Sequence, residues 1–278
     1  MRVQELISKV IQKCGVEPLK VTCDQIIEGN PDMEITGIVT TFMATVDVIK
    51  KAHSLGANFI ITHEPTYFTG DDERDWLEHD SVYLEKRKLI LEYGITIWRF
   101  HDHIHMATDG DGIYRGLIKE LGWEEYHIAK MVKKGRKILK DDDLCYKIPK
   151  TTVRALAQEL KCKLHMDVMQ IVGNPDMSVE RVGILVGGGS LGLGKEYMPM
   201  EFMEKENLDV LICGEILEWT ICAYARDAAM MRMNKALIIP GHNRTEEAGM
   251  KYLPEWLQPL APGVSIQFVE AGEPFTYL

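Results

Sequence analysis

The pentapeptide Gly29-Asn-Pro-Asp-Met33 occurs a second time, unchanged, as Gly173-Asn-Pro-Asp-Met177. Each copy is followed by a short apolar run typical of a strand, and two further pairs of segments recur in the same order along the chain. Those pairs are 57–64 with 208–215 and 97–101 with 238–242. An ordered set of repeats is typical of an internal duplication. The sequence therefore predicts two related halves.

Both halves alternate β-branched runs of strand length with stretches of helical periodicity, which is typical of an α/β fold. We predict two related α/β/α halves with mixed, largely parallel sheets. The predicted domains are 1–128 and 150–278, joined by a charged hairpin or linker at 129–149. In the first half we expect helices at 1–14, 46–55 and 83–93 and strands at 34–41, 58–62 and 95–100. In the second half we expect helices at 151–160 and 216–231 and strands at 169–172, 181–186, 209–213 and 236–240.

Composition excludes several classes of protein. The 278 residues include 32 Lys and Arg against 42 Asp and Glu, and the net charge of −10 argues against bulk nucleic-acid binding. The apolar runs are of strand length, far below the roughly 18 residues of a membrane span, so no membrane association is expected. The N-terminus mixes charged and apolar residues at helical spacing, unlike a signal peptide. Six widely spaced cysteines favour free thiols in a reducing compartment, and the expected location is cytoplasmic.

Candidate metal ligands follow three of the predicted strands. His63 and Glu64 follow the strand at 58–62, His101 and His105 the strand at 95–100, and His242 and Glu246 the strand at 236–240. Ligands collect outside the carboxyl ends of strands in parallel sheets. In the last two pairs, a spacing of four residues places both side chains on one face of a helix that begins there. A lone histidine is more often an ordinary polar residue, but this ordered set predicts a metal site.

The chemistry of these six side chains indicates a divalent transition metal. Imidazole and carboxylate suit Fe, Zn, Mn or Co, and the set contains no cysteine of the kind that closes a structural zinc site. Six ligands exceed the needs of one tetrahedral ion, so the set indicates two ions per chain, or one if some of these residues are not ligands. His103 lies between two of the candidates, and we interpret it either as a supporting residue or as an exposed one.

A glycine-rich loop is a second candidate site. It follows a buried predicted strand and consists of Gly187, Gly188, Gly189 and Ser190. Backbone N–H groups of such a loop can approach a phosphate closely, and a tight turn is the alternative interpretation. Glu215 is the second-half counterpart of Glu64, and either carboxylate is a candidate catalytic proton acceptor. For Glu215, an acidic residue that starts a helix is equally plausible.

Five segments carry a resemblance to a known family: 57–65, 101–105, the loop at 187–190, Cys213-Gly-Glu215, and Gly241-His-Asn-Arg-Thr-Glu246. In this order they resemble the motifs of the Nif-three-like family, also described as GTP cyclohydrolase type-two homologues or dinuclear-metal hexameric proteins. The resemblance implies two α/β domains, a two-metal site in the cleft between them, and a homohexamer. It implies His63, His242 and Glu246 as ligands. This chain departs from the family at two positions, with Glu64 in place of a usual histidine and His105 in place of a usual bridging aspartate.

Two functions are compatible with these motifs. The first is a metal-dependent hydrolase, resembling GTP cyclohydrolase type two, that uses metal-activated water on a small-molecule substrate able to carry phosphate. The alternative is a non-catalytic metal-binding or regulatory oligomer. An enzyme keeps an open coordination position, whereas a structural site is saturated by protein ligands.

Overall fold

The computed structural model describes residues 1–128 and 144–278, which form two compact units. Unit 1 comprises Met1–Gly116 and Glu247–Gly272, and unit 2 comprises Leu117–Glu246 and Glu273–Leu278. These units differ from the predicted domains 1–128 and 150–278. Residues 247–272 belong to unit 1 because strand β10 (Ile266–Phe268) pairs in parallel with β2 (Ile38–Thr41). A second link is the Thr40 hydroxyl, which donates to the Met250 carbonyl at 2.8 Å.

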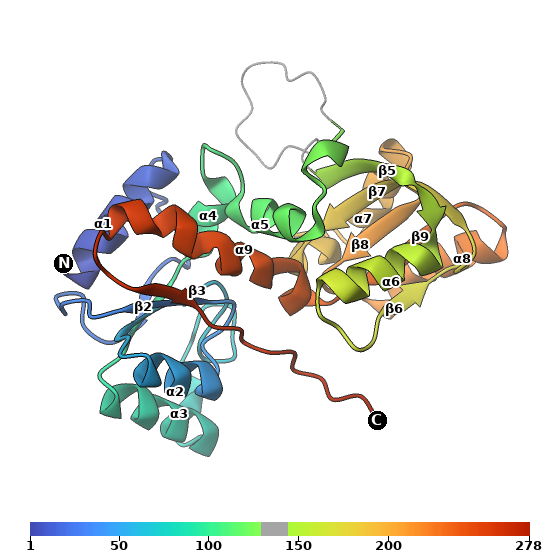
Figure 1. The fold of residues 1–278 in the computed structure, drawn as a ribbon. Coiled ribbons are helices and arrows are strands. Elements are labelled where there is room, and N and C mark those ends of the chain that lie inside the picture. The colour runs from blue at the N-terminus through green and yellow to red at the C-terminus, as the bar shows by residue number, and fades with distance from the viewer. Residues whose placement is uncertain (129–143) are drawn as a thin grey trace. The chain divides into compact units, whose positions relative to one another are not determined.

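Unit 1 is built on a five-stranded sheet in the order β1-β4-β3-β2-β10, in which only β1 runs antiparallel to its neighbour. Helices α2 and α3 lie on one side of this sheet in Figure 1, and α1 lies on the other. The remaining bounds are α1 Val3–Cys14, β1 Ile26–Glu28, α2 Val46–Ser54, β3 Phe59–Thr62, α3 Ser81–Glu92, β4 Thr96–Arg99, α4 Asp102–Met106 and α5 Gly112–Leu121.

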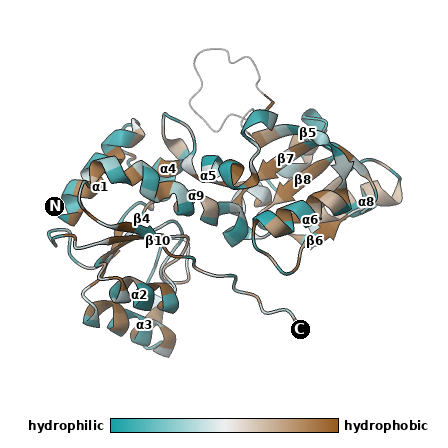
Figure 2. Ribbon diagram, viewed as in Figure 1, coloured by the Kyte–Doolittle hydropathy of each residue, from teal (hydrophilic) through white to brown (hydrophobic). Residues whose placement is uncertain are grey.

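Unit 2 contains a second five-stranded sheet, in the order β5-β7-β8-β9-β6. Strands β7, β8 and β9 are parallel, and β5 and β6 pair antiparallel at its edges. Figure 2 shows β8 in the brown of apolar residues, as expected for a buried strand, and the second half of β7 is buried as well. The bounds are β5 Cys145–Thr152, α6 Val153–Lys163, β6 Gln170–Val172, β7 Ser178–Leu185, α7 Met198–Lys205, β8 Val210–Cys213, α8 Ala223–Met230 and β9 Ala236–Ile239. Helix α9 (His242–Leu257) begins in unit 2, and its residues from Glu247 onward belong to unit 1.

The two units repeat one order of elements, a helix and two strands followed by alternating helices and strands. The repeated pentapeptide has the same position in each. In unit 1 the Met33 carbonyl accepts from the N–H of Val3 at 3.0 Å, and in unit 2 the Met177 carbonyl accepts from Val153 at 3.1 Å. The pentapeptide therefore satisfies an N–H group at the start of the first helix, a group that a helix cannot satisfy by itself. The predicted two related α/β halves with largely parallel sheets are confirmed.

One sequence expectation for unit 2 is wrong in detail. The helix expected at 216–231 begins only at Ala223, because Thr220 leaves helical geometry (φ −107°, ψ −105°) within a wider turn over Glu218–Cys222. The Thr220 hydroxyl donates to the Leu217 carbonyl at 3.3 Å, a local bond that competes with regular helix. The expected charged hairpin or linker at 129–149 overlaps strand β5 at its end, and its residues 129–143 lie outside the described part of the chain. Among the described residues, no helix combines the length and apolarity needed to span a membrane.

Candidate metal centre

The sheet of unit 1 brings three of the predicted ligands to one edge. Strands β3 and β4 are parallel and in register at their last residues, Thr62 and Arg99. His63 directly follows β3, and His101 follows β4 after one residue and stands at the start of α4. His105 lies one helical turn further on, so the expected helix with a spacing of four residues is confirmed.

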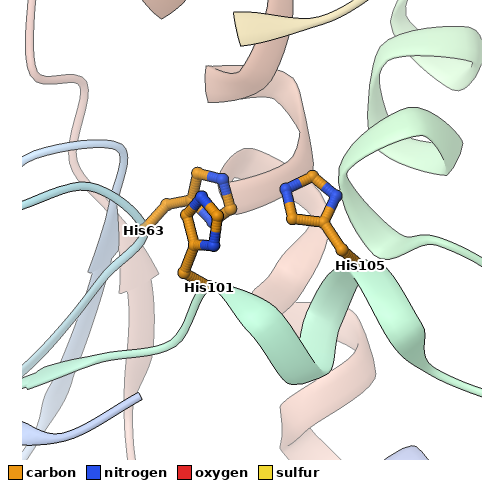
Figure 3. A group of neighbouring side chains, drawn as sticks. All are labelled: His63, His101 and His105. Atoms are coloured by element: carbon orange, nitrogen blue, oxygen red, sulfur yellow. The ribbon is translucent and has the colours of Figure 1, made fainter. Parts of the chain in front are cut away.

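The three imidazole rings form a cluster, which we call the histidine cluster (His63, His101 and His105). One ligand nitrogen from each ring lies within 4.8 Å of those of the other two. In Figure 3 the rings of His63 and His101 lie nearly face to face, with their centroids 4.5 Å apart, and the ring of His105 lies opposite them. The His105 centroid is 5.0 Å from that of His63 and 5.1 Å from that of His101. This spacing places three nitrogen donors around one point, as a cation requires.

Each ring in the histidine cluster is oriented by an acceptor beside its Nδ1 atom. The pairs are His105 with Asp111 Oδ2 at 2.8 Å, His101 with Asp102 Oδ1 at 3.0 Å, and His63 with the Phe100 carbonyl at 3.3 Å. A carbonyl or carboxylate accepts a hydrogen bond from a protonated Nδ1, so the ligating lone pair of a neutral ring lies on Nε2. Metal-binding histidines in proteins are held by carboxylate or carbonyl groups in this way.

The electrostatics of His101 follow from its acidic neighbours. Burial alone disfavours its charged form, but hydrogen bonds with Asp102, Cys23 and Glu64 outweigh burial and raise the pKa of His101 to about 12. The same His101 hydrogen bond holds the pKa of the Asp102 carboxyl well below its usual range. The His101 ring is therefore protonated and paired with these acidic neighbours.

Glu64 is buried beside the histidine cluster. Its Oε1 atom lies 3.5 Å from Nε2 of His101, and its Oε2 atom lies 3.5 Å from Nη2 of Arg99. The predicted ligand Glu64 is thus brought together with the histidine cluster within unit 1.

Asp24 is a supporting residue that the sequence did not reveal. Its side chain is 1% exposed and accepts four hydrogen bonds from the start of α4. Oδ1 accepts from the N–H groups of His101 and Asp102, both at 2.7 Å, and Oδ2 accepts from the N–H and Nδ1 of His103 at 3.0 and 2.7 Å. These bonds fix a helix of only five residues that carries His105 and follows His101. Of the two interpretations of His103, the structure supports the buried, supporting one.

The remaining predicted ligands lie together in unit 2. His242 is the first residue of α9, and its Nε2 atom lies 3.0 Å from Oε2 of Glu246, one turn later. Its Nδ1 atom lies 2.7 Å from Oε1 of Glu215. Glu215 therefore orients His242 as Asp111 orients His105, and this contact is additional to the proton-acceptor role predicted for it.

The glycine-rich loop forms a short turn over Gly187–Leu191 that packs against these ligands. The Gly187 N–H donates to the Thr245 hydroxyl at 3.0 Å, and the Ser190 hydroxyl donates to the Glu215 carbonyl at 2.6 Å. A Cβ atom on Gly187 would lie 2.0 Å from Oε1 of Glu246. The loop therefore fixes the backbone of Glu215 through Ser190, and position 187 requires glycine because it packs closely against Glu246. Phosphate binding by the loop stays a prediction.

The fold and the site together define a two-unit α/β protein whose strand ends present histidine and carboxylate groups. Residues 1–274 match the family described as Duf34/NIF3 (NGG1p interacting factor 3), and the chain belongs to this family. The resemblance to the Nif-three-like family is therefore confirmed.

Relatives and solved structures agree with this assignment. A protein of Lactococcus lactis named GTP cyclohydrolase 1 type 2 homolog is 24% identical over 255 residues, which cover 89% of this chain and 88% of that protein. The crystal structure of a Bacillus cereus protein related to NIF3 has a TM-score of 0.74 at 15% identity, over 100% of this chain and 99% of that chain. A Staphylococcus aureus protein has a TM-score of 0.73 at 18% identity, with the same coverage. At these identities the solved structures establish the fold alone.

Proposed function

We propose that this protein binds divalent metal ions through the histidine cluster and Glu64, and that His242 and Glu246 are also ligands. The observation that carries the proposal is the geometry of the three rings. Their nitrogens lie within 4.8 Å of one another while each Nδ1 faces its own acceptor. Ordinary buried histidines have no reason to converge in this way, whereas a cation bound by three Nε2 atoms requires it.

The ligand chemistry narrows the choice of metal. Three imidazoles and a carboxylate suit Zn, Fe, Mn or Co, and we propose one or two such ions per chain. Calcium and magnesium prefer sites made of oxygen alone.

We further propose that the metal serves hydrolysis of a small molecule. A bound divalent cation supplies Lewis acidity and lowers the pKa of water toward neutrality. Of the chain's own groups, Glu64 or Glu215 accepts the proton, and Glu215 in addition holds the His242 ring. The name of the Lactococcus lactis relative, a GTP cyclohydrolase homolog, supports a nucleotide-like substrate that can carry phosphate. The loop of Gly187, Gly188, Gly189 and Ser190 is our candidate site for that phosphate. A Cβ at Gly188 or Gly189 would meet open space, so these two positions leave room for a ligand.

A non-catalytic role is the second candidate, and one observation favours it. The three nitrogens of the histidine cluster converge, and the buried Glu64 lies 3.5 Å from the His101 ring. A fourth donor from Glu64 would saturate a tetrahedral ion, and His63 is fully buried. Such a site suits a metal-binding or regulatory protein. For either role we propose a homohexamer from the family resemblance, and a cytoplasmic location that the free cysteines support.

Metal analysis of the purified protein tests the proposal. Wild type, His63→Ala and His105→Ala are loaded with Co²⁺, dialysed and assayed by mass spectrometry of the metal. We expect metal in the wild type and its loss in both variants, while His53→Ala, a change at a histidine that stacks on Tyr93 outside the cluster, keeps the wild-type content. Full metal content in both cluster variants contradicts the proposed ligands.

Loaded protein is then assayed against panels of nucleotides and phosphoesters. Hydrolysis that disappears in His105→Ala supports the enzyme. A loaded protein that hydrolyses none of them favours the non-catalytic role.

A further inference from the structure

Arg99 lies at the centre of a buried network beside the histidine cluster. It is the last residue of β4 and is 4% exposed. Its Nε donates to the His63 carbonyl at 3.2 Å, its Nη1 donates to the Gly70 carbonyl, and its Nη2 lies 3.5 Å from Oε2 of Glu64. The guanidinium therefore holds both the backbone of one candidate ligand and the side chain of another.

Two neighbouring carboxylates stabilise the buried guanidinium of Arg99. A buried guanidinium requires anionic partners, because an unpaired buried charge is strongly destabilising. Glu64 is one partner, and the second is Asp72, whose Oδ2 lies 3.9 Å from Nη1. Asp72 is itself fixed, since its Oδ1 accepts from the Tyr67 N–H at 2.6 Å. Asp72 and Glu64 contact different nitrogens of the Arg99 guanidinium. Because Asp72 is fixed, it holds the guanidinium in place, and the guanidinium in turn attracts the Glu64 carboxylate.

The two oxygens of Glu64 consequently face different groups. Oε2 faces Arg99, and Oε1 faces Nε2 of His101, each at 3.5 Å. A carboxylate that binds one ion with both oxygens, or places one oxygen on each of two ions, must turn both oxygens toward metal. Glu64 can do so only by giving up Arg99.

We infer that Arg99 is a positioning residue that restricts Glu64 to a single ligand oxygen, Oε1. The inference rests on the proposed metal binding and assigns the mode in which Glu64 takes part. Arginine suits this task because its planar fork contacts several acceptors in a fixed geometry, which a lysine ammonium cannot reproduce.

A Co²⁺ titration of four proteins tests the inference: wild type, Arg99→Lys, Glu64→Gln and the double variant Glu64→Gln/Arg99→Lys. Arg99→Lys keeps the buried positive charge but releases Glu64. In Arg99→Lys we expect a weaker visible absorption per bound Co²⁺, because a second Glu64 oxygen raises the coordination number of the ion. We also expect the affinity for Co²⁺ to differ from that of wild type roughly 10-fold. In the Glu64→Gln background, Arg99→Lys should leave the visible absorption per bound Co²⁺ unchanged, because no Glu64 carboxylate remains to be released.

Arg87→Lys is the matched control, because Arg87 pairs with the buried Glu28 at 2.9 Å, outside the histidine cluster. A merely structural role for Arg99 lowers the midpoint of chemical unfolding in both backgrounds and leaves the Co²⁺ spectrum unchanged. An unchanged spectrum in folded Arg99→Lys overturns the inference.

Infrared spectroscopy gives a readout that needs no Arg99 variant. The bands that appear on metal binding in wild type and are missing in Glu64→Gln belong to Glu64. A wide separation of its two carboxylate stretches indicates one bound oxygen and supports the inference, and a narrow separation indicates two and overturns it. Wild type that binds no Co²⁺ contradicts the proposed function and the inference together, whereas bound metal with a narrow separation contradicts the inference alone.

Discussion

Nδ1 of His105 lies 2.8 Å from Oδ2 of Asp111, and the other oxygen of the same carboxylate caps helix α5. Oδ1 of Asp111 accepts from the N–H groups of Ile113 at 2.9 Å and Tyr114 at 3.1 Å. One side chain thus starts a helix and orients a candidate metal ligand. The two tasks can be separated by mutation, because asparagine is as good a helix cap as aspartate.

Asp111→Asn should therefore keep the fold and weaken metal binding. The amide oxygen still caps α5, so the free energy of unfolding should change by less than about 0.5 kcal/mol. The amide NH₂ then faces Nδ1 of His105 and favours the tautomer that carries its proton on Nε2, which weakens metal binding roughly 10- to 100-fold. Calorimetric Zn²⁺ titration measures the affinity. Asp80→Asn, the same change at the cap of α3, should leave the affinity at the wild-type value, and equal affinities in both variants would show that Asp111 does not orient His105.

Asp24→Ala should reduce both stability and metal affinity. The substitution leaves buried N–H donors at the start of α4 without their acceptor, which should lower the free energy of unfolding by about 1–3 kcal/mol. Urea unfolding and Zn²⁺ titration measure the two effects. Asp32→Ala removes an aspartate whose side chain is 74% exposed and pairs with Arg2, so both quantities should stay near wild type. A stable Asp24→Ala protein with normal affinity contradicts the view that Asp24 positions α4.

Gly187→Ala should disrupt the ligands of unit 2. The new Cβ would lie 2.0 Å from Glu246 Oε1 and 2.7 Å from His242 Nε2, at a φ of +48° that favours glycine. Overpacking of this kind destabilises by about 1–3 kcal/mol. Gly188→Ala is the neighbouring control, because its Cβ meets nothing within 4 Å. Thermal unfolding compares the pair, and equal melting temperatures would be evidence against the close approach of Gly187 to Glu246.

Lys86 should make stability rise with pH. Burial lowers the pKa of Lys86 from 10.5 to about 8, although nearby Asp72 partly opposes this. Between these values the unfolded chain binds more protons than the folded one, so the free energy of unfolding increases with pH. Between pH 8 and 10.5 the free energy of unfolding should rise by up to about 3 kcal/mol. Urea unfolding from pH 8 to 10.5 should show this slope in wild type and in the exposed-site control Lys88→Met, and Lys86→Met should lose it. Parallel curves for all three proteins would exclude Lys86 as the source.

The sequence predicted those parts of the fold and site that depend on local pattern. Histidines after β-branched runs, and pairs four residues apart, placed His63, His101 and His105 correctly on strand ends and on a short helix. The repeated pentapeptide predicted the shared order of elements in the two units. These features need only near neighbours, so periodicity and turn chemistry are enough to read them.

The supporting residues could not be predicted, because their roles depend on contacts between distant segments. Asp24 reaches α4 across nearly eighty residues of chain, and Arg99 gains its role from Glu64 and Asp72 in another loop. Nothing in the local sequence marks either residue. The unit boundary at Glu247 was missed for the same reason, because it follows from the pairing of Ile266 with Ile38.

The central claim is that His63, His101 and His105 bind one divalent cation through their Nε2 atoms. Anomalous diffraction from crystals grown with Zn²⁺, recorded on both sides of the zinc absorption edge, tests it most directly. We predict an anomalous peak about 2.0–2.1 Å from all three Nε2 atoms, with each Nδ1 still against its acceptor. A fully Zn²⁺-equilibrated crystal with no peak inside the histidine cluster, or with a peak bound only by residues outside it, would contradict the claim.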